Sequence, residues 1–99
     1  MMSDVTTHIG ILFVDLFIPT AQSLKNKRAV LKSIKDRVRP RFNVSVAELD
    51  HRDKWQTATL GFGMIGGDQR YLNRELENLL SLIRSHYAAD VCDHRIEFY

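Results

Sequence analysis

Apolar residues occur with two different periods along the chain, and each change of period marks a predicted element. Residues 9–18 are a run of β-branched and aromatic side chains that ends at Pro19, which indicates a central strand. After Ser23, apolar residues recur every three or four positions. This spacing predicts a helix that the Ser23 hydroxyl caps and that ends before Pro40.

Two further strands follow the first helix. Apolar and polar residues alternate over residues 42–47 and again over residues 55–65, which is the period of a half-buried strand. The polar segment 50–54 between them indicates a short hairpin loop. The two strands are therefore expected to pair as antiparallel neighbours.

A second helix and a final strand complete the pattern. Gly66 and Gly67 end the preceding strand, Asp68 is a favourable N-cap, and apolar residues then keep a helical spacing as far as Tyr87. Residues 91–99 are expected to form the last strand. The order predicts an α+β, ferredoxin-like βαββαβ fold, in which a four-stranded antiparallel sheet carries two helices on one face. Right-handed crossovers place the first and third strands at its centre.

Length and composition fit a single domain over residues 1–99. Cys92 is the only cysteine, which excludes an intrachain disulfide and favours a reducing compartment. The longest apolar run is interrupted by Asp15 and is too short to span a membrane, and the first residues lack the basic segment of a secretory signal. We therefore expect a cytoplasmic protein without membrane association.

The predicted fold leaves one face of the sheet without helices. If Leu12 and Val14 point toward the helices, their neighbours in the strand point outward, whereas a register shift of one residue would exchange the two faces. The outward set on this reading is Ile11, Phe13, Asp15, Phe17, Leu49, Trp55, Thr57 and Thr59. A monomer seldom leaves such a patch in water, so self-association, stacking of nucleic-acid bases, or cover by the chain's termini are the alternatives. Self-association as a homo-oligomer, most simply a dimer, is favoured, with contacts expected at Ile11, Phe13, Phe17 and Trp55.

Positive charge is concentrated on the first predicted helix. Eight basic residues and one acid lie between Lys25 and Arg41, a balance of +7, whereas the other 82 residues hold six basic and eleven acidic groups, a balance of −5. Five of these cations fall within about 80° on a helical wheel; they are Lys25, Arg28, Lys32, Lys35 and Arg39. Three more, Lys27, Arg37 and Arg41, are expected to add to the field. A neutral surface helix would interleave acids, so this stripe favours a polyanion such as nucleic acid over a simply solvated face or a membrane surface.

Other candidate sites are weaker. Residues 60–64 resemble the aromatic motif of RNA-recognition modules, but they lack its basic residue and its second ring, and Phe62 is assigned to the core. Cys92 and His94 alternate in the last strand and could begin a metal site, but no second pair of ligands has a suitable spacing. We therefore predict no metal site and expect Cys92 in the core.

Acid–base chemistry is conceivable only at the predicted hairpin loop. Glu48, Asp50, His51 and Asp53 lie close together there, and flanking carboxylates can tune a histidine toward neutral pH. The segment offers no nucleophile and no obvious pocket. We therefore expect a protein that is not an enzyme, with no catalytic residues and no small-molecule cofactor.

A family resemblance covers essentially the whole chain. The segment Ser23-Leu24-Lys25-Asn26-Lys27-Arg28, and the residues around His51 and Trp55, resemble the YlxP-like family of small bacterial proteins of unknown function. The resemblance implies a single ferredoxin-like domain. It also implies RNA or the ribosome as partner, because genes of this family often lie beside those for translation initiation and ribosome maturation. Asn26 stands where the family usually has Glu, which weakens a capping box with Ser23.

Overall fold

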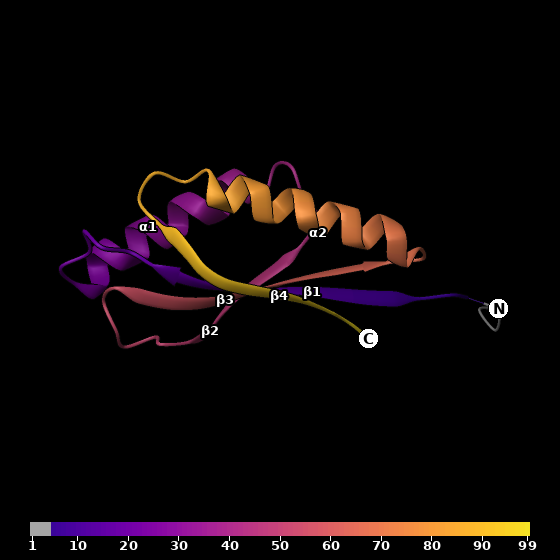
Figure 1. Ribbon diagram of the computed structural model, residues 1–99, viewed down its shortest axis with the longest axis horizontal. Helices are drawn as coiled ribbons and strands as arrows, with labels where there is room; N and C mark the ends of the chain where they lie inside the picture. The colour runs from indigo at the N-terminus through magenta and orange to yellow at the C-terminus, as the bar shows by residue number, and fades with distance from the viewer. Residues whose placement is uncertain (1–4) are drawn as a thin grey trace.

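The computed structural model describes residues 5–99, and the six elements occur in the predicted order (Figure 1). They are β1 (His8–Phe17), α1 (Leu24–Val38), β2 (Ser45–Asp50), β3 (Thr57–Gly66), α2 (Gln69–Arg84) and β4 (Asp90–Phe98). Residues 1–4, which belong to the predicted domain range, lie outside the described residues. The strands form one antiparallel sheet in the order β2-β3-β1-β4, and both helices cover the same face of it. The ferredoxin-like prediction is confirmed.

The two central strands supply most of the sheet's contribution to the core. β1 pairs with β3 along its whole length, so that Leu12 lies opposite Phe62 and Val14 lies opposite Leu60. All four side chains are fully buried beneath the helices, as the alternation in β3 and the favoured orientation of β1 predicted. Phe62 therefore belongs to the core and is not available to stack on a base.

Side-chain caps fix where both helices begin. The Ser23 hydroxyl accepts a hydrogen bond from the Asn26 amide at 3.0 Å, and the Asp68 carboxylate accepts one from the Arg70 amide at 2.9 Å. Asn26 does not complete a capping box with the cap residue itself, because its side-chain oxygen accepts from the amide of Gln22 at 3.1 Å. The predicted N-termini of both helices are thus confirmed.

The structure corrects several details. α2 ends at Arg84, so Tyr87 was wrongly placed on the helix and is 94% exposed, because the chain turns to bury His86 against α1. Cys92 is exposed at the irregular start of β4, where the pairing with β1 shifts register, and is not a core residue. β3 begins at Thr57, so Trp55 precedes the strand. No helix within residues 5–99 is long and apolar enough to span a membrane.

Candidate functional site

Three flanks of α1 can be distinguished by their surroundings. Leu31, Ile34 and Val38 are buried toward the core. A second flank faces α2 and the turn that follows it, since Ser33 Oγ lies 3.0 Å from His86 Nε2 and the Arg37 guanidinium donates to Ser85 Oγ at 3.3 Å. The third flank lies roughly 120–160° around the helix from the second and points away from α2.

The five predicted stripe residues all lie on this third flank, which we call the basic flank: Lys25, Arg28, Lys32, Lys35 and Arg39. Four of them are exposed and Lys35 is half-buried. Lys32 is paired with Asp36 at 2.6 Å, one turn further along the helix. No acid within residues 5–99 forms an ion pair with the other four. The row extends over about 21 Å, at a rise of 1.5 Å per residue.

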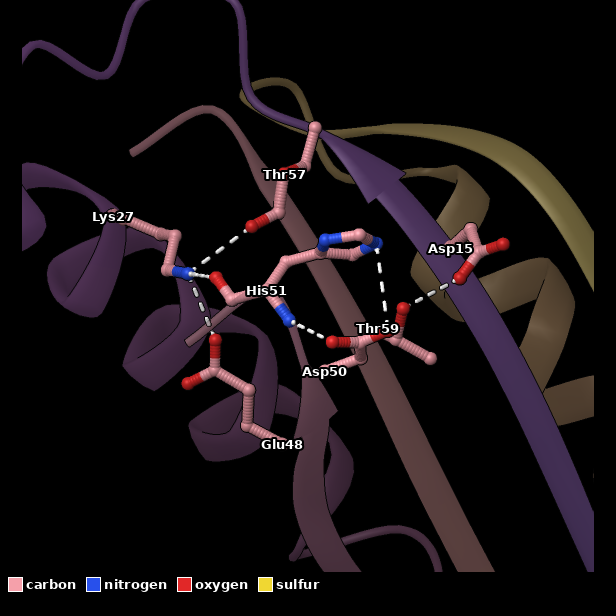
Figure 2. Close-up of polar contacts among 7 residues, drawn as sticks. All are labelled: Asp15, Lys27, Glu48, Asp50, His51, Thr57 and Thr59. Carbon is pink, nitrogen blue, oxygen red and sulfur yellow. Dashed lines mark hydrogen bonds and ion pairs between the residues drawn. The ribbon is translucent and has the colours of Figure 1, made fainter. Parts of the chain in front are cut away.

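One basic residue of α1 is not on the surface at all. Lys27 is 1% exposed, and its ammonium group donates to the carbonyl oxygens of His51 at 2.7 Å and Thr57 at 3.1 Å. The Glu48 carboxylate forms an ion pair with it at 2.8 Å (Figure 2). The expectation that Lys27 adds to the surface field is therefore wrong, because its charge is neutralised inside the protein.

These contacts join α1 to the β2–β3 hairpin, and we call them the Lys27 anchor. Glu48 lies on β2, His51 lies in the connecting loop and Thr57 begins β3, so one ammonium group ties both strands and the loop to the helix. The anchor thereby fixes the helix that carries the basic flank. The segment around Lys27 that resembles the family signature thus has a structural role alongside any role at the surface.

The hairpin residues that suggested acid–base chemistry are divided between different contacts. Glu48 points toward Lys27, whereas the Asp50 carboxylate accepts from the His51 amide at 2.8 Å and lies 3.9 Å from its imidazole. His51 has a left-handed backbone, with φ of 62°, and its carbonyl oxygen accepts from both Lys27 and the Lys54 amide. The part of His51 that the fold uses is its backbone. Within residues 5–99, no three acidic, histidine or cysteine side chains are grouped as metal ligands.

His86 lies in the turn that follows α2, contacts α1 through Ser33 and is buried. Its Nδ1 accepts a hydrogen bond from the Ala88 amide at 3.2 Å, so the neutral ring carries its proton on Nε2 and donates to Ser33 Oγ. Burial lowers the pKa of His86 below its ordinary value of 6.5, and the positive charge of Arg37 lowers it further. Protonation would remove the Nδ1 acceptor and place a charge in the interior.

The sign of the resulting pH dependence follows from this depressed pKa. As pH falls below about 6.5, the unfolded chain binds a proton at His86 before the folded protein does. The stability that the neutral His86 contributes is therefore complete above that pH and is lost below it. Urea unfolding is expected to show a slope of up to about 1.4 kcal/mol per pH unit from this group. His86→Gln should flatten the profile and His94→Gln, at an exposed site, should not. Equal flattening in both variants would contradict this role.

The open face of the sheet carries the predicted apolar residues, with polar cover at one side. Ile11 and Phe13 are half-buried, and Phe17 is 38% exposed at the end of β1. The Arg95 guanidinium lies 4.3 Å from the centre of the Phe13 ring. Trp55 is exposed in the loop before β3, outside the strands that form this face.

A polar network on β4 was not anticipated. Arg95 pairs with Glu97 at 2.9 Å, and the Tyr99 hydroxyl donates a short hydrogen bond to the same carboxylate, which lowers the pKa of Glu97. Asp15 accepts from the Thr59 hydroxyl at 2.7 Å, as Figure 2 shows. The alternation of charged residues in β4 places these groups on the open face.

Comparisons with known proteins agree with the sequence resemblance. A family described as protein of unknown function (DUF503) matches residues 9–96. The chain is 39% identical over 77 residues to Uncharacterized protein YlxP of Bacillus subtilis (strain 168), covering 78% of this chain and 84% of that protein. A solved structure, De novo designed protein Foldit4, is similar with a TM-score of 0.52 at 15% identity, covering 93% of this chain and 96% of that one. That likeness concerns the fold alone.

Proposed function

Because the chain belongs to the DUF503 family of proteins of unknown function, as the resemblance predicted, we propose a function from its own surface. The protein binds RNA, in a ribosomal and cytoplasmic setting, through the basic flank of α1 and without catalysis. The observation that supports this most strongly is the row of four cations without acidic partners within residues 5–99. These four are Lys25, Arg28, Lys35 and Arg39.

Such a row is unfavourable for the isolated protein. Cations one turn apart on a helix repel each other by a few tenths of a kcal/mol, and within residues 5–99 only Lys32 of this row has a compensating acid. A phosphate backbone offsets this repulsion, because each cation that neutralises a phosphate releases a condensed counterion. The spacing of about 4.5 to 6 Å along the helix axis gives a straight row of contacts. Contacts of this kind position a protein on RNA without reading its sequence.

The locations of Phe62 and Phe13 also favour backbone contact over base stacking. Phe62 is buried, and Phe13 lies on the open face beneath Arg95. Four acids share that face with this one arginine: Asp15, Asp50, Asp93 and Glu97. An RNA strand on the open face would meet a negative surface, whereas on the basic flank it meets only one acid, Asp36, which is paired.

A matched pair of double variants tests this proposal. Arg28→Gln with Arg39→Gln removes two charges from the basic flank, and Arg70→Gln with Arg74→Gln removes two from exposed positions of α2. We expect the first variant to bind a labelled RNA duplex about 10- to 60-fold more weakly at 0.1 M salt, because each of the two lost phosphate contacts lowers the affinity by up to about eightfold. The second should change affinity by about twofold or less, through the long-range field alone. Fluorescence anisotropy measures both, and equal losses would contradict a site on α1.

The second candidate function, association with a protein through the open face of the sheet, also has a specific observation in its favour. An apolar depression lies between β1, β2 and β3 on that face. Binding of a protein at this depression does not depend on whether α1 binds RNA.

A further inference from the structure

Gly63 has no side chain at a point where no atom of residues 5–99 fills the space. It lies in the interior of β3, and a Cβ atom built on it would have no neighbouring heavy atom within 4 Å. Gly10, Gly61 and Gly66 differ, because a Cβ on each would lie 2.7 to 3.1 Å from a leucine side chain. Glycine inside a strand costs about 0.5–1 kcal/mol relative to alanine. Packing within residues 5–99 gives no reason for glycine at position 63.

The empty space belongs to an apolar depression of about 300 Å³ on the open face. Its lining includes Ile11, Phe13, Ala47, Leu49, Gly61 and Gly63. Leu49 forms part of one wall, since its side chain lies over Gly61 and is 51% exposed. Ile65, two residues beyond Gly63 on the same face, is 67% exposed. The face therefore carries both a hollow and projecting apolar side chains.

We propose that a second copy of this chain covers the open face, sheet against sheet, in a two-fold symmetric dimer. A two-fold interface needs projections and hollows on the same surface, because each copy must supply both. Leu49 and Ile65 are the projections, and the space above Gly63 is the hollow that receives an apolar side chain of the partner.

The size of the face suits a stable dimer. Ten residues at about 3.3 Å and four strands at about 4.8 Å give a footprint of roughly 600 Å². Accessible area exceeds a flat footprint because side chains corrugate the surface, and stable interfaces bury about 800 Å² per partner. The cluster of exposed apolar side chains, Ile9, Phe17, Leu49 and Ile65, lies within this footprint.

The charges on the open face disfavour a polyanion and leave a second copy acceptable. Four acids and one arginine disfavour a polyanion, and the arginine is already paired with Glu97. Asp15 and Asp93 lie opposite each other toward the Phe17 end, away from the depression. We place the two-fold axis in the plane of the interface, above the depression and perpendicular to the strands. At about 3.3 Å per residue, the Asp15–Asp93 pairs of the two copies then lie roughly 20 Å apart. That separation exceeds the screening length of about 8–10 Å at physiological salt.

In this dimer the helices lie on the two outer surfaces. The two basic flanks are then both accessible, and one dimer presents two rows of cations. This consequence rests on the proposed function, whereas the dimer itself does not. Oligomeric state and RNA binding are measured separately, so a result that contradicts the dimer does not contradict RNA binding, and the reverse also holds.

Sedimentation velocity from micromolar to millimolar protein tests the dimer. We expect wild-type protein to sediment at twice the chain mass of 11.5 kDa in the upper part of this range. Gly63→Glu, which meets no clash in one chain, should weaken dimerisation at least about 100-fold, because it places a charge in the apolar centre of the contact. Gly63→Ala should weaken it less, by filling the hollow with a methyl group. Asn73→Glu, with the same change of charge on the outer side of α2, should leave the dimer intact.

Several results would overturn the proposal. Wild-type protein that stays monomeric over the whole range excludes a dimer of useful affinity. A dimer that Gly63→Glu does not weaken uses another surface. A monomer whose RNA affinity falls in Gly63→Glu and not in Asn73→Glu would assign the open face to nucleic acid instead. Circular dichroism and urea unfolding of both glycine variants establish that each chain is folded.

Discussion

Replacement of Lys27 by methionine is expected to lower the free energy of unfolding by about 3–5 kcal/mol. The methionine side chain fills similar space, so the loss comes mainly from the polar groups left behind. The half-buried Glu48 carboxylate, whose paired oxygen is buried, would lose its partner, and the carbonyl oxygens of His51 and Thr57 would each lose a donor. Domains of this size are stable by about 5–15 kcal/mol in total, so this loss is a large fraction. Urea unfolding followed by circular dichroism measures it.

The chain provides a close control for this experiment. Lys25 lies two residues earlier on the same helix and is exposed, so Lys25→Met should change stability by about 0.5 kcal/mol or less. Lys27→Met combined with Glu48→Leu removes both charges and should recover much of the lost stability, since apolar pairs often replace buried ion pairs without cost. If Lys27→Met and Lys25→Met were equally stable, the Lys27 anchor would not hold the hairpin.

Removal of the four unpaired cations of the basic flank is the second large effect that we expect. Glutamine at Lys25, Arg28, Lys35 and Arg39 should weaken binding to an RNA duplex by up to about 4,000-fold at 0.1 M salt. The fold should persist, because the exposed ends of these side chains make no ion pair within residues 5–99. Loss of repulsion along the helix should raise stability slightly. Anisotropy titration and thermal unfolding of the same sample measure both quantities.

A second four-fold variant distinguishes a local site from general charge. Glutamine at Arg52, Lys54, Arg70 and Arg74 removes the same total charge from exposed positions outside α1. Its affinity should fall by about tenfold or less, since charges beyond a screening length contribute little. If the two four-fold variants lost affinity equally, binding would follow net charge, and α1 would have no special part in it.

Much of the fold could be predicted from the sequence because its elements follow local rules. The alternation in β3 assigned Leu60 to the buried face, and of the two registers open for the continuous apolar run of β1, the structure shows the one with Val14 buried. Ser23 and Asp68 marked both helix starts. The end of α2 was missed, because tertiary contacts determine it. His86 turns inward to meet Ser33, and a helical spacing that extends to Tyr87 does not reveal that turn.

The Lys27 anchor could have been found from the same patterns. On a helical wheel Lys27 lies among Leu31, Ile34 and Val38, and Glu48 follows Val44 and Val46 in the alternation of β2. Two opposite charges at positions of the buried faces indicate a buried ion pair. The two carbonyl oxygens that complete the site could not be foreseen, because the left-handed backbone of His51 is a property of the folded loop. Likewise, no sequence pattern shows that the space above Gly63 is empty.

The salt dependence of RNA binding tests the function of the basic flank most directly. Four phosphate contacts predict that the logarithm of the association constant falls with the logarithm of salt concentration at a slope of about −3.6 for a duplex. The variant with glutamine at Lys25, Arg28, Lys35 and Arg39 should show a slope near zero, whereas the control variant should keep the wild-type slope. Equal slopes in the wild type and the basic-flank variant would contradict RNA binding through α1.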